Sequence, residues 1–317
     1  MLKKISDSFV QLLFTLLALY LTYLLLRYPA QSLTYANTGL LLWFQKMIPT
    51  LLPFMILSGI MVRRNLTERF AKWFHPLFHA IWGTSLNGSY VILIGMLCGF
   101  PMGARVIGEL CHVGRLSERE GEFLLSFCNN IGPIYFTSFV MGTLSLSGHW
   151  APLLIMYGVP LFYGWIYRML FYRNPATFFY SPITSGDSTR VPSLLEAVDE
   201  SIVSGLIGIG KLGGYMVFFN LLNVMLLPFS SLPQMFLALC NCMLEITSGI
   251  NYIGQKGMFL ILTLLPFGGL SCMAQTYSMI KDTNLSLSRY FMHKCIQTAI
   301  TALIYVFFYA SASVYSF

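Results

Sequence analysis

Hydrophobic positions along the chain gather into long runs without regular alternation. The first run, Phe9–Leu26, contains no charged residue. At about 1.5 Å of rise per residue, it nearly crosses a hydrocarbon core of about 30 Å. Further apolar runs follow at Leu40–Val62, Tyr90–Phe100, Phe123–Leu146, Ala151–Phe171, Ser201–Leu227, Met235–Ile246, Met258–Ile280 and Tyr290–Ala310. This pattern predicts an all-α integral membrane protein.

The amino-terminal run has Lys3 and Lys4 before it, as a signal sequence would, but no small-residue cleavage site follows it. We therefore expect residues 1–38 to form an uncleaved transmembrane anchor helix.

Later runs are interrupted where helix breakers and polar groups occur together, at Gly99–Gly103, Asn129–Pro133, Glu245–Gly249 and Pro266–Ser271. Unwound backbone at membrane depth leaves polar groups unpaired, at several kcal/mol each, so it persists only where protein or a water-filled cavity surrounds it. We therefore expect broken helices and re-entrant hairpins around one interior site. The residues expected to shape the backbone at these breaks are Gly99, Pro101, Gly103, Gly132, Pro133, Gly249, Gly268 and Gly269.

A segment rich in Pro, Ser and Thr, residues 173–192, divides the rest of the chain into comparable halves, 39–172 and 193–317. Sliding the second half back along the first places Glu245–Gly249 on Gly99–Gly103. The later break of the second half then corresponds loosely to the later break of the first. This order of features predicts that each half is one copy of a repeat.

The distribution of basic residues favours two repeats of opposite orientation. With a cytoplasmic amino terminus and two re-entrant hairpins, the linker at 173–192 falls in the cytoplasm and the second half runs inverted. Most of the 19 Lys and Arg residues, Lys294 among them, then face the cytoplasm of a bacterial inner membrane. Arg63–Trp82, where aromatic residues lie among basic ones, is expected to form an amphipathic helix on the cytoplasmic membrane surface.

Composition supports a membrane protein. Apolar residues make up 56% of the chain and charged residues only 10%, against about 25% charged in soluble domains. The net charge of +7 is spread in short clusters between apolar runs, so we expect membrane lipid, and no nucleic acid, as a partner.

Three motifs that suggest catalysis or cofactor binding lack the context they need. Gly205–Lys211 has the spacing of a nucleotide-binding loop, but the Ser or Thr that would hold magnesium does not follow it. His75 and His79 have no further ligand nearby in the sequence, and Cys240 and Cys242 have no second pair. We therefore expect no enzyme, no metal site and no cofactor.

Several segments together resemble a known family of membrane proteins. They are Pro49–Met61, Gly99–Leu110, Gly114–Pro133, Leu244–Ile250 and Phe267–Thr276. In these segments the chain resembles the nucleoside recognition or Gate domain family, above all its sporulation integral membrane proteins. The resemblance implies a fold like the pore-forming parts of nucleoside transporters and ferrous-iron permeases, and a role in spore cortex formation. The sequence lacks the GTP-binding domain of the iron permeases, which counts against iron.

Glu245 is the strongest candidate for a functional side chain. A charge at the centre of a membrane helix costs about 2.5–3.5 kcal/mol on insertion scales, so it should face a polar cavity or a partner. The resemblance to nucleoside transporters implies that Glu245 accepts a hydrogen bond from a substrate hydroxyl or couples an ion. The alternative is a structural role, as the partner of Lys211 or of backbone N–H groups at the break.

The remaining candidate substrate-binding residues are neutral polar residues at the breaks of both halves: Thr247, Ser248, Asn129, Asn130, Ser271 and Gln275. Such side chains suit recognition of a sugar or a base, and half-helix ends could supply partial charges to an anion. Alternatively, they only satisfy carbonyl groups that the breaks set free. Outside this group, we expect an ion pair between Arg105 and Glu109, and Ser117 as a helix cap.

These features predict a transporter or permease-like protein for a small polar metabolite, with a nucleoside-like compound as one candidate and with a coupling ion. The alternative is a membrane scaffold of the sporulation programme that does not transport. Substrate, coupling ion and oligomeric state stay open at this point.

Overall fold

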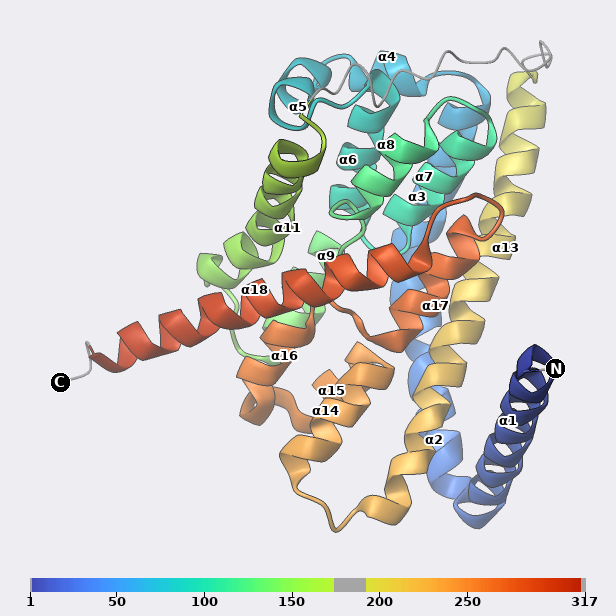
Figure 1. The fold of residues 1–317 in the computed structure, drawn as a ribbon, viewed down its shortest axis with the longest axis vertical. Coiled ribbons are helices and arrows are strands. Elements are labelled where there is room, and N and C mark those ends of the chain that lie inside the picture. Colours follow the sequence, from blue (N-terminus) through green and yellow to red (C-terminus); the bar gives the residue numbers. More distant parts are fainter. Residues whose placement is uncertain (1, 174–191, 315–317) are drawn as a thin grey trace.

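The computed structural model describes residues 2–173 and 192–314, and in these residues all regular structure is helical (Figure 1). The expected all-α fold is therefore confirmed. The linker expected at 173–192 lies almost entirely outside the described residues.

Within the described residues, four stretches are long and apolar enough to cross a membrane: Pro29–Arg63, Trp150–Phe171, Leu194–Phe229 and Ile246–Ile280. The first consists of α2 (Pro29–Leu42), the π-helical turn η1 (Trp43–Met47) and α3 (Ile48–Arg63). The second is α11 (Trp150–Phe171), and the third is α13 (Leu194–Leu221) with η3 (Leu222–Phe229). Large apolar side chains stay exposed along these helices, as a lipid environment requires.

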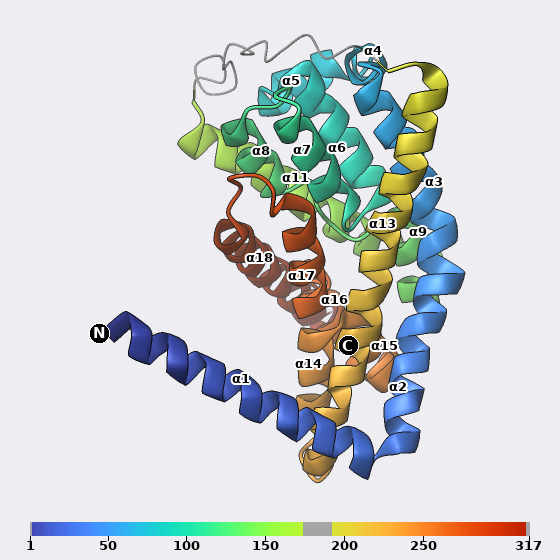
Figure 2. The same cartoon turned by 90° about the vertical axis from the view of Figure 1, so that its right-hand side faces the viewer.

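α13 packs along α2 and α3 for most of its length (Figure 2). Small residues allow this close approach, since a Cβ on Gly39 would lie only 2.8 Å from the Met216 carbonyl oxygen. Further along, the Trp43 indole packs over Gly213 and donates a hydrogen bond to the Ile209 carbonyl at 2.7 Å. The two long helices therefore form one continuous wall of the molecule.

A helical hairpin, called hairpin 1, is formed by α6 (Leu86–Cys98) and α7 (Met102–His112). Ser85 caps α6 by accepting a hydrogen bond from the backbone of its first turn. At the tip, Gly99 adopts φ +82°, which L side chains rarely adopt, and Pro101 follows a cis peptide bond. The break lies where Gly and Pro in the sequence predicted it.

Hairpin 2 is formed by α14 (Gln234–Leu244) and α15 (Ile246–Ile253). Its break is the single extended residue Glu245, with φ −151° and ψ 117°. A Cβ on Gly249 would overlap the side chain and backbone of Cys242, so the two helices of this hairpin are in close contact.

Two helices are broken near their middle. Broken helix 1 begins as α8 (Glu118–Leu125) and continues after Ser126–Gly132 as α9 (Pro133–Tyr135), η2 (Phe136–Val140) and α10 (Met141–Thr143). Broken helix 2 runs through α16 (Met258–Leu264) and, after residues 265–268, α17 (Gly269–Ile280). η4 (Gly254–Gly257) joins it to hairpin 2.

Each hairpin tip packs against the break of one broken helix. In hairpin 1, a Cβ on Gly99 would overlap the Gly132 backbone, and the Phe100 N–H donates to the Asn130 carbonyl at 2.6 Å. In hairpin 2, a Cβ on Gly269 would lie 3.3 Å from the Cα of Glu245. Figure 1 shows hairpin 1 in the upper part of the molecule and hairpin 2 in the lower part.

The amino-terminal helix α1 (Leu2–Arg27) lies within the segment expected to be the anchor, residues 1–38, whose last part belongs to α2, and it leans away from the bundle, meeting it near η3 (Figure 2). The expected ion pair also forms, with 2.9 Å between Arg105 Nε and Glu109 Oε1. Ser117 caps α8, as expected, by accepting from the Glu120 N–H at 3.2 Å.

Two expectations were wrong. Arg63–Trp82 does not form one amphipathic helix but two short ones, α4 (Thr67–Ala71) and α5 (His75–Trp82). Pro76 lies in the first turn of α5, and a proline there cannot continue a preceding helix, because it lacks the N–H that such a helix needs. Lys294, expected to face the cytoplasm, is fully buried. It belongs to α18 (Leu287–Val314), which crosses the bundle (Figure 1).

Candidate functional site

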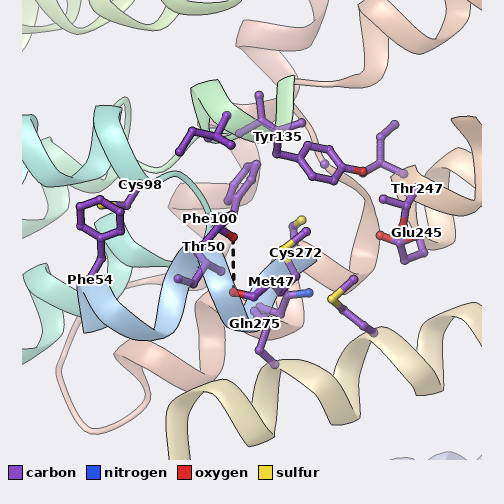
Figure 3. A pocket seen from close by; sticks show the side chains of 18 of the residues that line it. Met47, Thr50, Phe54, Cys98, Phe100, Tyr135, Glu245, Thr247, Cys272 and Gln275 are labelled. Atoms are coloured by element: carbon purple, nitrogen blue, oxygen red, sulfur yellow. Dashed lines mark hydrogen bonds between the residues drawn. The ribbon is translucent and has the colours of Figure 1, made fainter. Parts of the chain in front are cut away.

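A cavity of about 80 Å³ lies where the hairpin tips and helix breaks meet (Figure 3). Both hairpins, both broken helices and both long helices contribute to its wall. The lining residues are Met47, Thr50, Leu51, Phe54, Leu97, Cys98, Phe100, Ile131, Gly132, Ile134, Tyr135, Leu212, Met216, Glu245, Ile246, Thr247, Gly268, Cys272 and Gln275. Most of this wall is apolar, so the few polar groups in it decide what the cavity can bind.

Glu245 brings a carboxylate to the cavity wall and is only 4% exposed. It precedes α15 and caps that helix, since its Oε2 accepts a hydrogen bond from the Ser248 N–H at 2.9 Å. The amino-terminal end of a helix carries partial positive charge, which stabilises a carboxylate at this place.

Lys211, one of the structural partners considered for Glu245, lies on an exposed face of α13. In the part of the chain that the structure describes, Glu245 forms no ion pair. The backbone of α15, the other partner considered, does hold one carboxylate oxygen. The Glu245 carboxyl group therefore faces the cavity without a cationic side chain beside it.

Two buried hydroxyl groups in the cavity wall have no hydrogen-bond partner within the described residues, the phenol of Tyr135 and Oγ1 of Thr247. Tyr135 comes from broken helix 1 and Thr247 from hairpin 2, and the Tyr135 ring extends across the cavity toward Thr247 and Glu245 (Figure 3). Buried polar groups in folded proteins are nearly always paired. These two hydroxyls are therefore positioned to pair with water or with a solute in the cavity.

Gln275 is the fourth polar contribution and comes from α17. Its Nε2 donates to Ser271 Oγ at 2.9 Å, one turn earlier in the same helix. Ser271 thus orients Gln275 without lining the cavity itself. Thr50 also lines the wall, but its hydroxyl donates to the Lys46 carbonyl at 2.6 Å within its own helix.

Ser248 lies just behind the wall and links hairpin 2 to α13. Its hydroxyl donates to Asn220 Oδ1 at 2.5 Å, while Asn220 Nδ2 donates to the Met216 carbonyl at 2.8 Å. Of the candidates from the second half, Glu245, Thr247 and Gln275 therefore face the cavity, and Ser248 and Ser271 support them.

Asn129 and Asn130 do not line this cavity and belong to a second polar cluster behind hairpin 1. Asn129 Nδ2 donates to both Thr276 Oγ1 and Tyr290 OH at 3.0 Å, and its Oδ1 accepts from the Ala104 N–H at 3.3 Å. Asn130 Oδ1 accepts from Lys294. The breaks of both halves are thus brought together, but their polar side chains divide between two clusters.

Tyr135, Asn220 and Gln297 were not among the residues expected from the sequence to be functional, and Lys294 was expected only as a basic residue facing the cytoplasm. A tyrosine in an apolar run looks like any other aromatic residue of the membrane, so Tyr135 gave no signal. For α18 a signal was present, because Lys294, Gln297 and Thr301 are spaced by three and four residues and so share one helix face. All three are buried.

Comparison with known proteins finds similarity to a membrane protein. The chain is 24% identical to the sporulation integral membrane protein YlbJ of Bacillus subtilis (strain 168), in an alignment over 323 positions that covers 90% of this chain and 79% of the relative. No protein-family model and no solved structure matches the chain. Together with the apolar helices, homology to an integral membrane protein identifies the chain as a membrane protein.

Proposed function

We propose that this chain is a permease of the bacterial inner membrane that moves small neutral or cationic polar solutes, and that it acts in spore formation. The single observation that carries this proposal is the cavity in which Glu245 and two unpartnered hydroxyls face one another at the meeting point of the helix breaks. Transporters commonly place their substrate at such discontinuous helices near the membrane midplane.

The proposal includes an architecture of two inverted repeats, at 39–172 and 193–317, each of Gate-domain type. Each half contains, in the same order, a long helix, a helical hairpin, a broken helix and a further long helix. In each half the hairpin tip packs against the break of the following broken helix. The amino terminus and the 173–192 linker are cytoplasmic in this proposal.

The chemistry of the wall restricts the class of solute. Of the described residues that line the cavity, none is Lys, Arg or His, whereas Glu245 is acidic. A carboxylate and two hydroxyls can accept hydrogen bonds from hydroxyl, amine or ammonium groups, whereas the carboxylate repels an anion. We therefore propose neutral or cationic solutes, and binding rather than catalysis.

Size sets a second restriction. Pockets for drug-sized ligands measure about 300–1,000 Å³, and this cavity measures about 80 Å³. In the conformation described here it accepts a few waters or a very small solute. A nucleoside-like substrate therefore requires the hairpin tips to move apart.

The same small volume supports a second candidate function, a membrane scaffold of the sporulation programme that keeps the fold without transport. For such a scaffold the cavity would be filled by water alone. The name of the B. subtilis relative supports a sporulation role for either candidate.

A thermal-shift titration distinguishes the two functions. Purified wild type, Glu245→Gln and the surface control Asp199→Asn are heated with nucleosides, nucleobases, sugars and small amines. A ligand at a hundredfold excess over its Kd stabilises the folded state by about 2.7 kcal/mol. A permease shows a rise in Tm with one solute class in wild type and control, and no rise in Glu245→Gln. If no solute raises the Tm of wild type, the scaffold is favoured.

A further inference from the structure

Lys294 of α18 is a fully buried basic residue outside the solute cavity. Its Nζ donates to Asn130 Oδ1 at 2.7 Å and to Gln297 Oε1 at 3.2 Å. The ring centroids of Phe100 and Tyr290 lie 5.3 and 5.6 Å from the same nitrogen. Two amide oxygens and two aromatic faces therefore surround one ammonium group.

None of the Asp and Glu residues that the structure describes forms an ion pair with Lys294. A charge buried without a counter-ion loses several kcal/mol of solvation, so its neutral partners must compensate. Intramembrane ionisable residues that are held in this way usually have a functional role.

The two amide oxygens are fixed in place by the other end of each amide. Asn130 Nδ2 donates to the Phe127 carbonyl at 2.6 Å, and Gln297 Nε2 donates to the Ser126 carbonyl at 2.6 Å. If either amide turned over, its NH₂ group would face the ammonium and its oxygen would face a carbonyl. The Phe127 and Ser126 carbonyls therefore favour the amide orientation in which both oxygens point at Nζ.

The backbone adds to this preference for positive charge. Ser126 and Phe127 follow the last turn of α8 (Glu118–Leu125), where carbonyl groups without helical partners carry partial negative charge. Aromatic faces also attract cations, most strongly where water is excluded. Amide oxygens and aromatic faces thus favour a cation at one point, and the end of α8 holds the amides that supply the oxygens.

We infer that Asn130, Gln297, Phe100 and Tyr290 form a binding site for a small monovalent cation, and that the Lys294 ammonium occupies this site as a cation tethered to the chain. The site lies between broken helix 1, hairpin 1 and α18. Phe100 borders it on one side and lines the solute cavity on the other. A cation there consequently holds the tip of hairpin 1 closed against α18.

The consequence for coupling rests on the proposed function: a permease with a tethered cation at this point needs no sodium or potassium ion there. The cation site itself can be tested without any solute, so failure of the transport proposal and failure of this inference are separate results.

The test compares Tm values of wild type, Lys294→Ala, Lys294→Met and the surface control Lys281→Ala. Each is measured in sodium, potassium, ammonium, methylammonium and choline chloride at equal ionic strength. Alanine opens the space that the lysine fills and leaves the amide oxygens in place, whereas methionine fills the space without a charge.

Wild type, Lys281→Ala and Lys294→Met are each expected to have a Tm that does not change among the five salts, and the Tm of Lys294→Met is expected to lie below that of the other two. Lys294→Ala is expected to melt several degrees lower in choline, and to recover in a saturable way with at least one small cation. A Lys294→Ala protein whose Tm is the same in all five salts would overturn the inference. If Lys294→Ala cannot be purified, Lys294→Met decides, because the inference requires its Tm to lie below that of wild type and equality would overturn it.

Discussion

A side chain on Gly99 would overlap the backbone of Gly132, so the tip of hairpin 1 and the break of broken helix 1 touch through two residues that lack side chains. A side chain on Gly132 would be equally crowded, since its Cβ would lie 2.7 Å from the Cys98 carbonyl oxygen. This pair positions Phe100 and Tyr135 around the solute cavity.

Gly99→Ala is therefore expected to destabilise the protein strongly. The substitution combines the overlap with a φ of +82°, and backbone strain of this kind costs about 1–3 kcal/mol by itself. Gly210→Ala serves as the control, because a Cβ there meets nothing within 4 Å and alanine favours the helix. Tm in detergent should fall by several degrees for Gly99→Ala and stay constant or rise for Gly210→Ala. Equal Tm values would contradict the contact.

Removing the unpartnered hydroxyls of the cavity, in contrast to Gly99→Ala, is expected not to destabilise the protein. Tyr135→Phe and Thr247→Val remove buried hydroxyls that have no protein partner in the described structure, so their Tm values should equal or exceed that of wild type. If a solute uses these hydroxyls, each variant should bind it roughly tenfold more weakly, as expected for the loss of a hydrogen bond of about 1.4 kcal/mol. Titration of each variant with the solute, followed by Tm, measures both effects. Unchanged affinity in both variants would show that the two hydroxyls do not bind the solute.

Removing the Asn129 side chain should instead lower stability and leave solute selectivity unchanged. Asn129→Ala removes three buried hydrogen bonds, those of the amide side chain with Thr276, Tyr290 and Ala104, and each buried group left without a partner costs about 1–3 kcal/mol. We expect a large fall in Tm but unchanged selectivity among solutes, because Asn129 does not line the cavity. Thr137→Ala, at an exposed position, is the control. A change of selectivity without loss of stability would place Asn129 in the site.

Glu120, outside the membrane-spanning stretches, makes stability depend on pH. It is 1% exposed, accepts the Ser85 N–H at 2.7 Å, and has its pKa raised by burial from 4.5 to about 7. Between pH 4.5 and about 7 the Glu120 carboxyl is protonated in the folded state and has lost its proton in the unfolded state. The contribution of Glu120 to the free energy of unfolding is therefore complete below about pH 4.5 and is lost as the pH rises to about 7. At about 1.4 kcal/mol per pKa unit, the loss reaches about 3 kcal/mol.

Glu120→Gln should therefore flatten the dependence of Tm on pH between 5 and 7.5. The Glu122 carboxyl, whose pKa burial also raises, stays in the variant, so only the difference from wild type is informative. Glu118→Gln, on the same helix, should keep the wild-type slope. Identical slopes for wild type and Glu120→Gln would refute the assignment.

The sequence predicted the helix breaks well, because Gly, Pro and polar residues inside apolar runs conflict with continuous membrane helices. Gly99, Pro101 and Glu245 lie at the hairpin tips for this reason. Glu245 was expected to face a polar cavity or a partner, and in the structure it lines the cavity and accepts the Ser248 N–H. Whether Lys211 or a backbone amide was the partner of Glu245 depended on which face of α13 is turned toward hairpin 2. A uniformly apolar run does not show which of its faces is buried.

The contents of the cavity were less predictable. Asn129 and Gln275 looked equivalent in the sequence, since both are neutral polar residues in or just after a break, but a break has two sides and only one of them faces the cavity. Lys294 was misplaced because counting basic residues near the ends of apolar runs assigns it to the surface together with Arg289. Its true position depends on contacts with Asn130, which lies 164 residues away in the chain.

Uptake into proteoliposomes tests the central claim most directly. Purified wild type, Glu245→Gln and Asp199→Asn are reconstituted separately, and accumulation of labelled neutral and cationic solutes is compared with that of protein-free liposomes. The permease account predicts saturable uptake of at least one solute by wild type and by Asp199→Asn, and uptake at the level of empty liposomes for Glu245→Gln. Wild-type uptake equal to that of empty liposomes for every solute, or full uptake by Glu245→Gln, would contradict it.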